Sequence, residues 1–248
     1  MKNVLVTGVS GEMGRATART LSEEGYFIYG VYNVHKSEAE KLKKEIDNIE
    51  IFQCDFSDRQ NTIALISKLK DIKFSGIVNN AGIFLDMDFD NFDIEKWEET
   101  FEVNVHAPLL LVQGLQNNLE DRGSIVNITS TDGMVGATAG LAYAASKAAL
   151  INLTQSFTNI FASRKIRANN IALGWIGNGM QAPEAVLKEA ARLNPLERTG
   201  KYEEIADVIS FLLSSKSSYV NGETIVVDGG DMATNYILQK EGEILNKK

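Results

Sequence analysis

Short apolar runs alternate along the chain with longer amphipathic stretches. Seven apolar runs predict strands, at 4–6, 27–32, 49–54, 76–79, 124–128, 166–173 and 224–227. Between them, apolar positions recur with a helical period at 13–24, 37–47, 58–70, 94–118, 141–164 and 202–214. Repeated strand–helix alternation predicts right-handed crossovers and a parallel sheet covered on both faces. We therefore expect one doubly wound α/β domain over residues 1–248, with a parallel seven-stranded sheet and helices on both faces.

Two segments fall outside this alternation. In 175–196, two glycines and two prolines surround a short helical pattern at 184–193, and the segment is longer than an ordinary strand–helix connection. Long loops of this kind often serve as substrate lids, which is the role we predict. The segment 231–248 follows the last strand as a C-terminal extension. Its stretch 236–245 could pack on a neighbouring subunit or fray.

Composition limits the classes of partner. The formal charge is −8 over 248 residues, which argues against nucleic-acid or anionic-membrane partners because both need a basic patch. No apolar run approaches the ~20 residues of a membrane span, and the first apolar run is too short for a signal peptide. The single cysteine excludes an intrachain disulfide, and with only two histidines we expect no metal site. We expect a cytoplasmic protein.

A glycine-rich turn joins the first strand to the first helix. Gly8, Gly11 and Gly14 are spaced as Gly-x-x-Gly-x-x-Gly. Glycines at this position permit a tight turn and let the backbone approach a pyrophosphate at a helix N-terminus. No Gly-Lys-Ser/Thr follows, so a Walker-type loop is excluded. A turn without a ligand is the alternative, and Glu12 would repel a phosphate unless its side chain points away.

Tyr143 and Lys147 are four residues apart in a predicted helix, so they share one face. A tyrosine alone titrates near ~10 and is a poor proton donor at neutral pH. A neighbouring cation favours the phenolate and lowers that pKa, which would make a tuned acid. Taken alone, the pair could also be an accident of a surface helix.

Further segments accompany this pair in a fixed order. They are Asn79-Asn80-Ala81-Gly82, Asn104 in a helix, Ser130 thirteen residues before Tyr143, the strand 166–175 and the closing segment 219–230. With them, the chain resembles the short-chain dehydrogenase/reductase family from about residue 4 to residue 230. It is most similar to the 3-oxoacyl-[acyl-carrier-protein] reductase branch. The resemblance implies a Rossmann-type domain that binds a dinucleotide.

The resemblance implies catalytic roles for four residues. Tyr143 would be the acid in carbonyl reduction and the base in alcohol oxidation. Lys147 would lower the pKa of Tyr143 and bond the nicotinamide ribose. Ser130 would hydrogen-bond the carbonyl oxygen of the substrate. Asn104 would hold a water that links Lys147 to solvent.

The resemblance also implies a cofactor site. Its predicted residues are Gly8, Ser10, Gly11, Glu12, Met13, Gly14, Tyr32, Asn33, Asp55, Phe56, Asn79, Ala81, Gly82, Tyr143, Lys147, Gly174, Ile176 and Asn178. The end of the second strand has no acid for a ribose 2′-hydroxyl, and Arg15, His35 and Lys36 are nearby, which favours NADP(H). NAD(H) stays possible, because a basic residue often found in NADP-binding relatives is replaced by Gly11, and Glu12 is anionic.

The function we predict is NADPH-dependent reduction of a 3-oxoacyl thioester, on acyl carrier protein or CoA, to the 3-hydroxyacyl form, as in fatty acid biosynthesis. The apolar lid favours an acyl group, and Arg122 and Arg164 are the candidate cations for an acidic carrier. Two alternatives stay open: an NAD-dependent alcohol, sugar or steroid dehydrogenase, and a dinucleotide-sensing regulator without turnover. Relatives of this kind imply a homotetramer.

Overall fold

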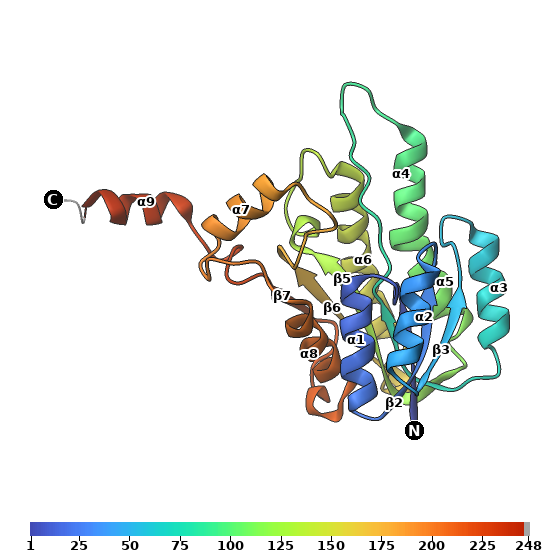
Figure 1. The fold of residues 1–248 in the computed structure, drawn as a ribbon. Helices are drawn as coiled ribbons and strands as arrows, with labels where there is room; N and C mark the ends of the chain where they lie inside the picture. Colours follow the sequence, from blue (N-terminus) through green and yellow to red (C-terminus); the bar gives the residue numbers. More distant parts are fainter. Residues whose placement is uncertain (246–248) are drawn as a thin grey trace.

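The computed structural model describes residues 1–245, and its core is a parallel sheet of seven strands (Figure 1). The strand order is β3-β2-β1-β4-β5-β6-β7, which is the doubly wound arrangement predicted. The strands are β1 (Lys2–Thr7), β2 (Tyr26–Tyr32), β3 (Ile49–Gln53), β4 (Phe74–Asn79), β5 (Leu119–Ser130), β6 (Arg167–Leu173) and β7 (Thr224–Val227).

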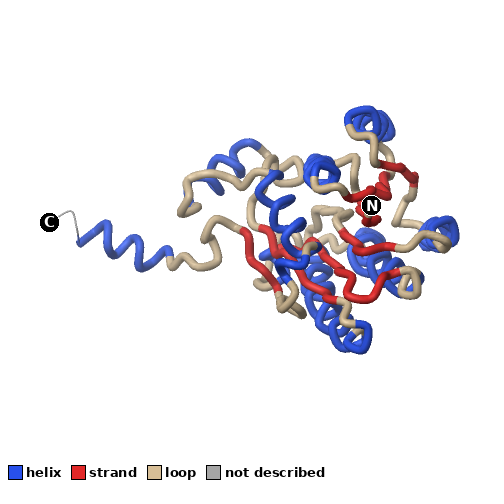
Figure 2. The backbone as a smooth tube through the Cα atoms, turned by 90° about the horizontal axis from the view of Figure 1, so that it is seen from below, coloured by secondary structure: helices blue, strands red, loops and turns tan. Residues whose placement is uncertain are grey.

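Helices cover both faces of the sheet (Figure 2). The α-helices of the described residues are α1 (Glu12–Glu23), α2 (Lys36–Glu45), α3 (Arg59–Leu69), α4 (Ile94–Phe101), α5 (Ala107–Gly114), α6 (Leu141–Ile160), α7 (Glu184–Leu193), α8 (Tyr202–Leu213) and α9 (Tyr236–Leu245). Side chains alternate along each strand. In β1, Val4 and Val6 pack in the core beneath α1, α2 and α8, whereas Leu5 packs in the core beneath α3, α5 and α6.

The predicted helix 94–118 is three elements in the structure. Between α4 and α5 lies a π-helical turn, η1 (Glu102–His106), in which the N–H of Ala107 bonds to the carbonyl of Glu102. Pro108 has no N–H, so the ordinary α-helical bond to the carbonyl of Asn104 cannot form. The last helix of this segment, α5, ends at Gly114, earlier than predicted. The strand β5 begins at Leu119 because this residue pairs with Phe74, the first residue of β4. Single π-helical turns within α-helices frequently lie at functional sites.

Because all strands are parallel, their carboxyl ends lie at one edge of the sheet. Thr7, Asn79, Ser130 and Leu173 are the last residues of β1, β4, β5 and β6. Ligands of open α/β sheets bind at this edge, where the strand order reverses. In this chain the reversal lies at β1, which is flanked by β2 and β4.

The predicted lid is held at its two ends and loosely packed between them. At its start, the hydroxyl of Tyr202 donates to Asn178 Oδ1 at 2.9 Å and accepts the backbone N–H of Asn178 at 3.1 Å. At its end, Asn194 Nδ2 donates to the carbonyl of Asp228 at 2.7 Å. Between them, none of the side chains of α7 is buried. The middle of this segment therefore has few buried contacts with the rest of the fold, and its role as a lid stays a prediction.

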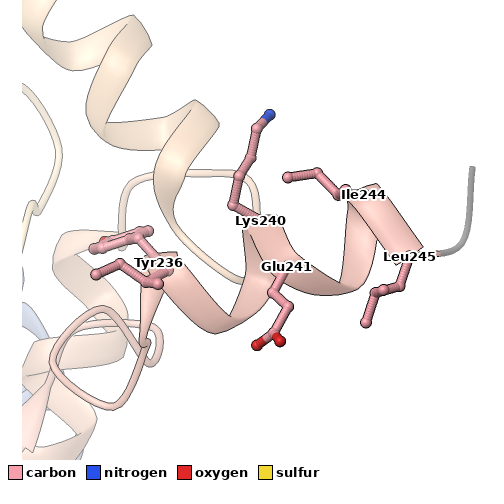
Figure 3. A pocket seen from close by; sticks show the side chains of 6 residues that line it. Tyr236, Lys240, Glu241, Ile244 and Leu245 are labelled. Atoms are coloured by element: carbon pink, nitrogen blue, oxygen red, sulfur yellow. The ribbon is translucent and has the colours of Figure 1, made fainter.

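The C-terminal helix α9 projects away from the rest of the fold (Figure 1). It exposes apolar side chains, and Ile237 is 80% exposed. Figure 3 shows Lys240 and Ile244 on one side of the helix and Glu241 and Leu245 on the other. The last three residues of the predicted extension, 246–248, lie outside the described residues. Among residues 1–245, no helix combines the length and apolar character that a membrane crossing requires.

Candidate active site

Ser130, Tyr143 and Lys147 come together at the carboxyl edge of the sheet. Ser130 ends β5, and the other two lie in the first two turns of α6, which packs against β5 and β6. The Ser130 hydroxyl acts on the phenol of Tyr143 in the direction that lowers its pKa, and it donates to the carbonyl of Leu173 at 3.5 Å. Lys147 Nζ lies 5.4 Å from the centre of the Tyr143 ring and donates to the carbonyl of Ile128 at 2.9 Å. The grouping places a proton donor, a second hydroxyl and a cation side by side.

Burial controls the titration of this group. It raises the pKa of Tyr143 to about 12, with a smaller rise from the charge of Asp132, while the bond from Ser130 acts in the opposite direction. Burial also lowers the pKa of Lys147 from 10.5 to about 8. In this structure the pKa of Tyr143 is raised and Lys147 is not among the causes of the shift, so a lowering of that pKa by Lys147 stays a prediction. Removal of water disfavours both charged forms, and the ammonium bonds to a backbone carbonyl instead of the phenol.

Asn104 connects two parts of the site. Its Oδ1 accepts the backbone N–H of Ile83 at 2.9 Å, and its Nδ2 donates to the carbonyl of Ile83 and to Ser146 Oγ, both at 3.0 Å. Ser146 in turn donates to the carbonyl of Tyr143 at 2.7 Å. Both amide hydrogens of Asn104 are thus in use, so the predicted water cannot be held by these donors. The side chain instead fixes the loop after β4 against α6.

The glycine turn has the shape that a pyrophosphate needs. Gly8 has a left-handed φ of 75°, and a Cβ on Gly14 would lie 2.1 Å from the carbonyl oxygen of Gly8. No side chain of the described residues caps the amino end of α1, which starts after Gly11. The Thr7 hydroxyl accepts the backbone N–H of Ala81 at 2.9 Å and so joins the turn to the segment after β4. Uncapped N–H groups in such a cradle fit an anionic phosphate.

The carboxylate of Glu12 is turned toward a cation, which removes the predicted conflict with a phosphate. Glu12 Oε1 lies 2.5 Å from Arg15 Nη2. Arg15 Nη1 donates to the carbonyl of Ser10 at 2.7 Å and lies 3.3 Å from Glu38 Oε2. Met13, beside them, packs against the hydrophobic core. The predicted cation Arg15 is therefore at the turn, but two carboxylates share it.

Four predicted cofactor residues have buried side chains. Tyr32 and Ile176 belong to the core beneath α1, and Phe56 belongs to the core on the opposite face. Asn79 is 2% exposed and donates from Nδ2 to Asn127 Oδ1 at 2.7 Å. Because these side chains are largely buried, their main-chain atoms are the more accessible groups, and the predicted cofactor contacts of the four residues stay predictions.

Two further predicted glycines leave room where a side chain would obstruct the site. A Cβ on Gly82 would lie 3.3 Å from both Asn104 Oδ1 and Lys147 Nζ. A Cβ on Gly174 would lie 2.7 Å from the Cβ of Asp228. Glycine therefore allows the close approach of chain segments around Lys147 and at the end of β6.

The remaining predicted cofactor residues lie in loops at the same edge. Asn33 is exposed just after β2. Asp55 Oδ1 accepts both the N–H and the hydroxyl of Ser57, at 3.0 and 2.7 Å. The Oδ1 atom of Asn178 is occupied by Tyr202, as described above. A carboxamide could therefore bond to Nδ2 of Asn178 or to the second lone pair of its Oδ1.

Several residues that shape the site were not predicted from the sequence. A buried chain of hydrogen bonds runs from Asn127 Nδ2 to Thr154 Oγ1 at 2.7 Å and from Thr154 Oγ1 to Asn170 Oδ1 at 2.6 Å. Asparagines inside apolar strand runs are the signal for such a chain, because buried amides need partners. No comparable sequence signal marks Asp132, whose charge raises the pKa of Tyr143, or Tyr202, which bonds to Asn178. An acid or a tyrosine in a polar segment is common and does not by itself indicate a functional site.

Comparisons with known proteins agree with this geometry. The family model described as Enoyl-(Acyl carrier protein) reductase matches residues 8–231. Protein FixR of Bradyrhizobium diazoefficiens is 37% identical over 92% of this chain and 86% of its own length. The 3-oxoacyl-[acyl-carrier-protein] reductase FabG of Thermotoga maritima is 33% identical over 92% of this chain and 97% of its own length. A blue fluorescent protein from a metagenomic library, solved in complex with NADPH, superposes with a TM-score of 0.88 at 30% identity, covering 93% of this chain and 97% of that chain. The chain belongs to the short-chain dehydrogenase/reductase family of NAD(P)-dependent oxidoreductases.

Proposed function

We propose that the protein is an NADPH-dependent reductase that converts a 3-oxoacyl thioester into the 3-hydroxyacyl thioester. The observation that carries the proposal is the contact of Ser130, Tyr143 and Lys147 at the carboxyl edge of the sheet, beside a glycine turn suited to a pyrophosphate. The name of the Thermotoga relative supports the substrate, and the NADPH-bound structural relative supports the cofactor.

A pKa of about 12 keeps Tyr143 a neutral phenol at pH 7, which is the protonation state that an acid in carbonyl reduction needs. The raised pKa also makes this phenol a weaker acid than a free tyrosine, so the transfer depends on stabilisation of the developing charges around it. Ser130 would bond to the same oxygen as negative charge develops there. Lys147, with a pKa of about 8, exchanges protons readily near neutral pH and would restore the phenol.

Together, these side chains and the cofactor would supply the proton and the hydride that the reduction consumes. A bound NADPH would supply the hydride, leaving NADP⁺. The carbonyl π bond breaks as the carbon accepts the hydride and the oxygen accepts the proton of Tyr143. The product is a secondary alcohol, and the phenolate left behind is reprotonated through Lys147 from solvent.

The lid supports an acyl substrate. An open groove runs between Trp175 and the inner side of α7, and its lining includes Ala185, Val186 and Leu193. Binding of an acidic acyl carrier protein finds less support. Arg122 and Arg164 were its predicted cations, and in the structure they do not lie at the cleft. Arg122 lies in the first half of β5, eight residues before Ser130 at the other end of the strand. Arg164 bonds to Asp121 there. The turnover experiment therefore tests both kinds of thioester, that of CoA and that of an acyl carrier protein.

The test is a turnover assay with acetoacetyl-CoA and an acetoacetyl carrier protein, each with NADPH and with NADH. We expect NADPH oxidation by the wild type and a loss of about 10²- to 10⁴-fold in kcat for Tyr143→Phe. NADPH binding, followed by nucleotide fluorescence, should change little. Tyr219→Phe is the matched control, because Tyr219 is fully exposed.

Full activity of Tyr143→Phe would contradict the assigned acid. Oxidation of alcohols, sugars or steroids with NAD⁺, without turnover of either thioester, would replace the proposal by the dehydrogenase alternative. The proposed assembly is a homotetramer, which light scattering of the full chain would measure.

A further inference from the structure

Phe84 lies in the loop after β4, and its ring packs against the ring of Tyr143. The two ring centres are 5.4 Å apart, and the ring planes are tilted by 60°. Tilted aromatic pairs at this separation attract each other beyond the effect of burying their surfaces. The contact therefore places an apolar ring directly beside the phenol that we assign as the proton donor.

Asn104 fixes the backbone that carries this ring. Its Oδ1 accepts the N–H of Ile83 at 2.9 Å, and its Nδ2 donates to the carbonyl of Ile83 at 3.0 Å. Both main-chain polar groups of the residue before Phe84 are thus held by one buried side chain. Three residues after Phe84, the N–H of Met87 donates to the carbonyl of Ala139 at 3.2 Å. The chain is therefore held on both sides of the ring.

Gly140 provides the space into which the ring of Phe84 fits. A Cβ on Gly140 would lie 2.7, 3.3 and 3.7 Å from three atoms of that ring, and these would be its three nearest neighbours. The φ of Gly140 is −101°, so a left-handed backbone is not the reason for a glycine here. The ring is therefore seated between Gly140, which precedes α6, and Tyr143 in the first turn of that helix.

The polar groups that act on the phenol of Tyr143 or lie close to it come from other elements than Phe84. Ser130 ends β5, Asp132 lies in the 3₁₀-helical turn η2 (Thr131–Gly133), and Lys147 lies one turn farther along α6. Burial is the largest cause that raises the pKa of Tyr143 to about 12, ahead of the charge of Asp132. An apolar ring in contact with the phenol adds to this burial because it keeps water away from one side.

We infer that Phe84 is a positioning residue for the proton transfer: its ring, seated against Gly140, holds the phenol of Tyr143 in place and closes one side of it to water. The inference rests on the proposed function, because it requires Tyr143 to be the proton donor. It also gives Asn104 a part in the reaction, since this side chain holds the backbone that carries the ring.

The first experiment measures kcat and KM for acetoacetyl-CoA with NADPH, and the pH profile of 3-hydroxybutyryl-CoA oxidation with NADP⁺. Phe84→Ala should lower kcat about three- to tenfold, the factor that corresponds to one lost aromatic contact, with KM within about twofold. The rising limb of the oxidation profile should move to lower pH, because water beside the phenol favours the phenolate. Phe84→Tyr keeps the ring and should restore kcat to within about twofold of the wild type.

Phe89→Ala is the matched control, because Phe89 lies in the same loop and is 78% exposed. Its kcat should stay within about twofold of the wild type, and its pH profile should not move. Phe84 itself is 41% exposed, so its replacement does not open the hydrophobic core.

The second experiment uses the space at Gly140. Gly140→Ala should displace the ring in the wild type, and should lower both kcat and the urea concentration at the midpoint of unfolding. In a chain that already carries Phe84→Ala, the space is free and Gly140→Ala should change neither quantity further. This double-mutant cycle tests the seating of the ring directly.

Three outcomes would overturn the inference. The first is a wild-type kcat and an unmoved pH profile in Phe84→Ala. The second is a Phe84→Tyr variant as impaired as Phe84→Ala, because the ring would then not be the group that matters. The third is additive effects of Gly140→Ala and Phe84→Ala on the midpoint of unfolding. A wild type that turns over neither the CoA nor the carrier thioester would instead refute the proposed function, and this result is distinguished from the others because it appears before any variant is compared.

Discussion

Replacing Lys147 with methionine should stabilise the fold while removing activity. Lys147 is 4% exposed, and its ammonium bonds to one backbone carbonyl, that of Ile128. The lowering of its pKa from 10.5 to about 8 corresponds to about 3 kcal/mol of unfavourable burial of the charged form. Methionine has a similar length and no charge. The lost hydrogen bond offsets about 1 kcal/mol, so we expect a net gain of about 2 kcal/mol at pH 7.

The gain should depend on pH in a defined window. Below pH 8 the lysine is protonated in both the folded and the unfolded chain, so the wild type bears the full burial cost. Between pH 8 and 10.5 only the unfolded chain keeps the proton, and the stability of the wild type rises toward that of the variant. The difference between the two proteins is therefore largest below pH 8 and should shrink steadily above it.

Urea unfolding of both proteins from pH 6 to 9.5 measures this difference. Lys188→Met is the matched control, because Lys188 is 76% exposed, and its stability should stay within about 0.5 kcal/mol of the wild type. A Lys147→Met variant that is less stable than the wild type, or whose advantage is the same at pH 7 and 9.5, would show that burial does not govern this lysine.

Three further changes test other parts of the site. Asp132→Asn removes a charge that raises the pKa of Tyr143, so the pH profile of alcohol oxidation should move to lower pH, and an unmoved profile would contradict this coupling. Tyr202→Phe removes both bonds to Asn178, which should raise KM about fivefold and speed hydrogen exchange in the lid, with kcat affected less. Asn127→Ala breaks the buried hydrogen-bond chain and should lower the free energy of unfolding by about 2–4 kcal/mol in urea, whereas a change below 1 kcal/mol would mean that the chain is not stabilising.

The order of the elements could be predicted from the sequence because the hydrophobic period changes at each one. Buried parallel strands are continuous apolar runs, and covering helices repeat every three to four residues, so the two are easily separated. The boundaries in the segment 94–118 could not be predicted, because its apolar pattern continues through the π-helical turn. Pro108 was the available signal, since its missing N–H interrupts a helical ladder.

The spatial grouping of Ser130, Tyr143 and Lys147 could also be predicted, whereas its titration could not. The spacing of Tyr143 and Lys147 fixes their shared face, and Ser130 ends a strand at the same edge. Spacing does not tell how much water surrounds a side chain. Whether a cation lowers the pKa of a phenol or burial raises it depends on the segments that close over both groups, and these come from distant parts of the sequence.

Two glycines show how the burial arises. A Cβ on Gly133 would lie 2.8 Å from the main-chain carbon of Lys147, and a Cβ on Gly82 would lie 3.3 Å from its Nζ. Both segments can therefore lie against Lys147 and exclude water because they lack side chains at these points. The same exclusion lowers the pKa of Lys147 and raises that of Tyr143. In a more open site the pKa of the lysine would stay closer to 10.5, and the ammonium would release protons less readily near neutral pH. The destabilising burial of Lys147 and the proton transfer we propose thus have one structural cause.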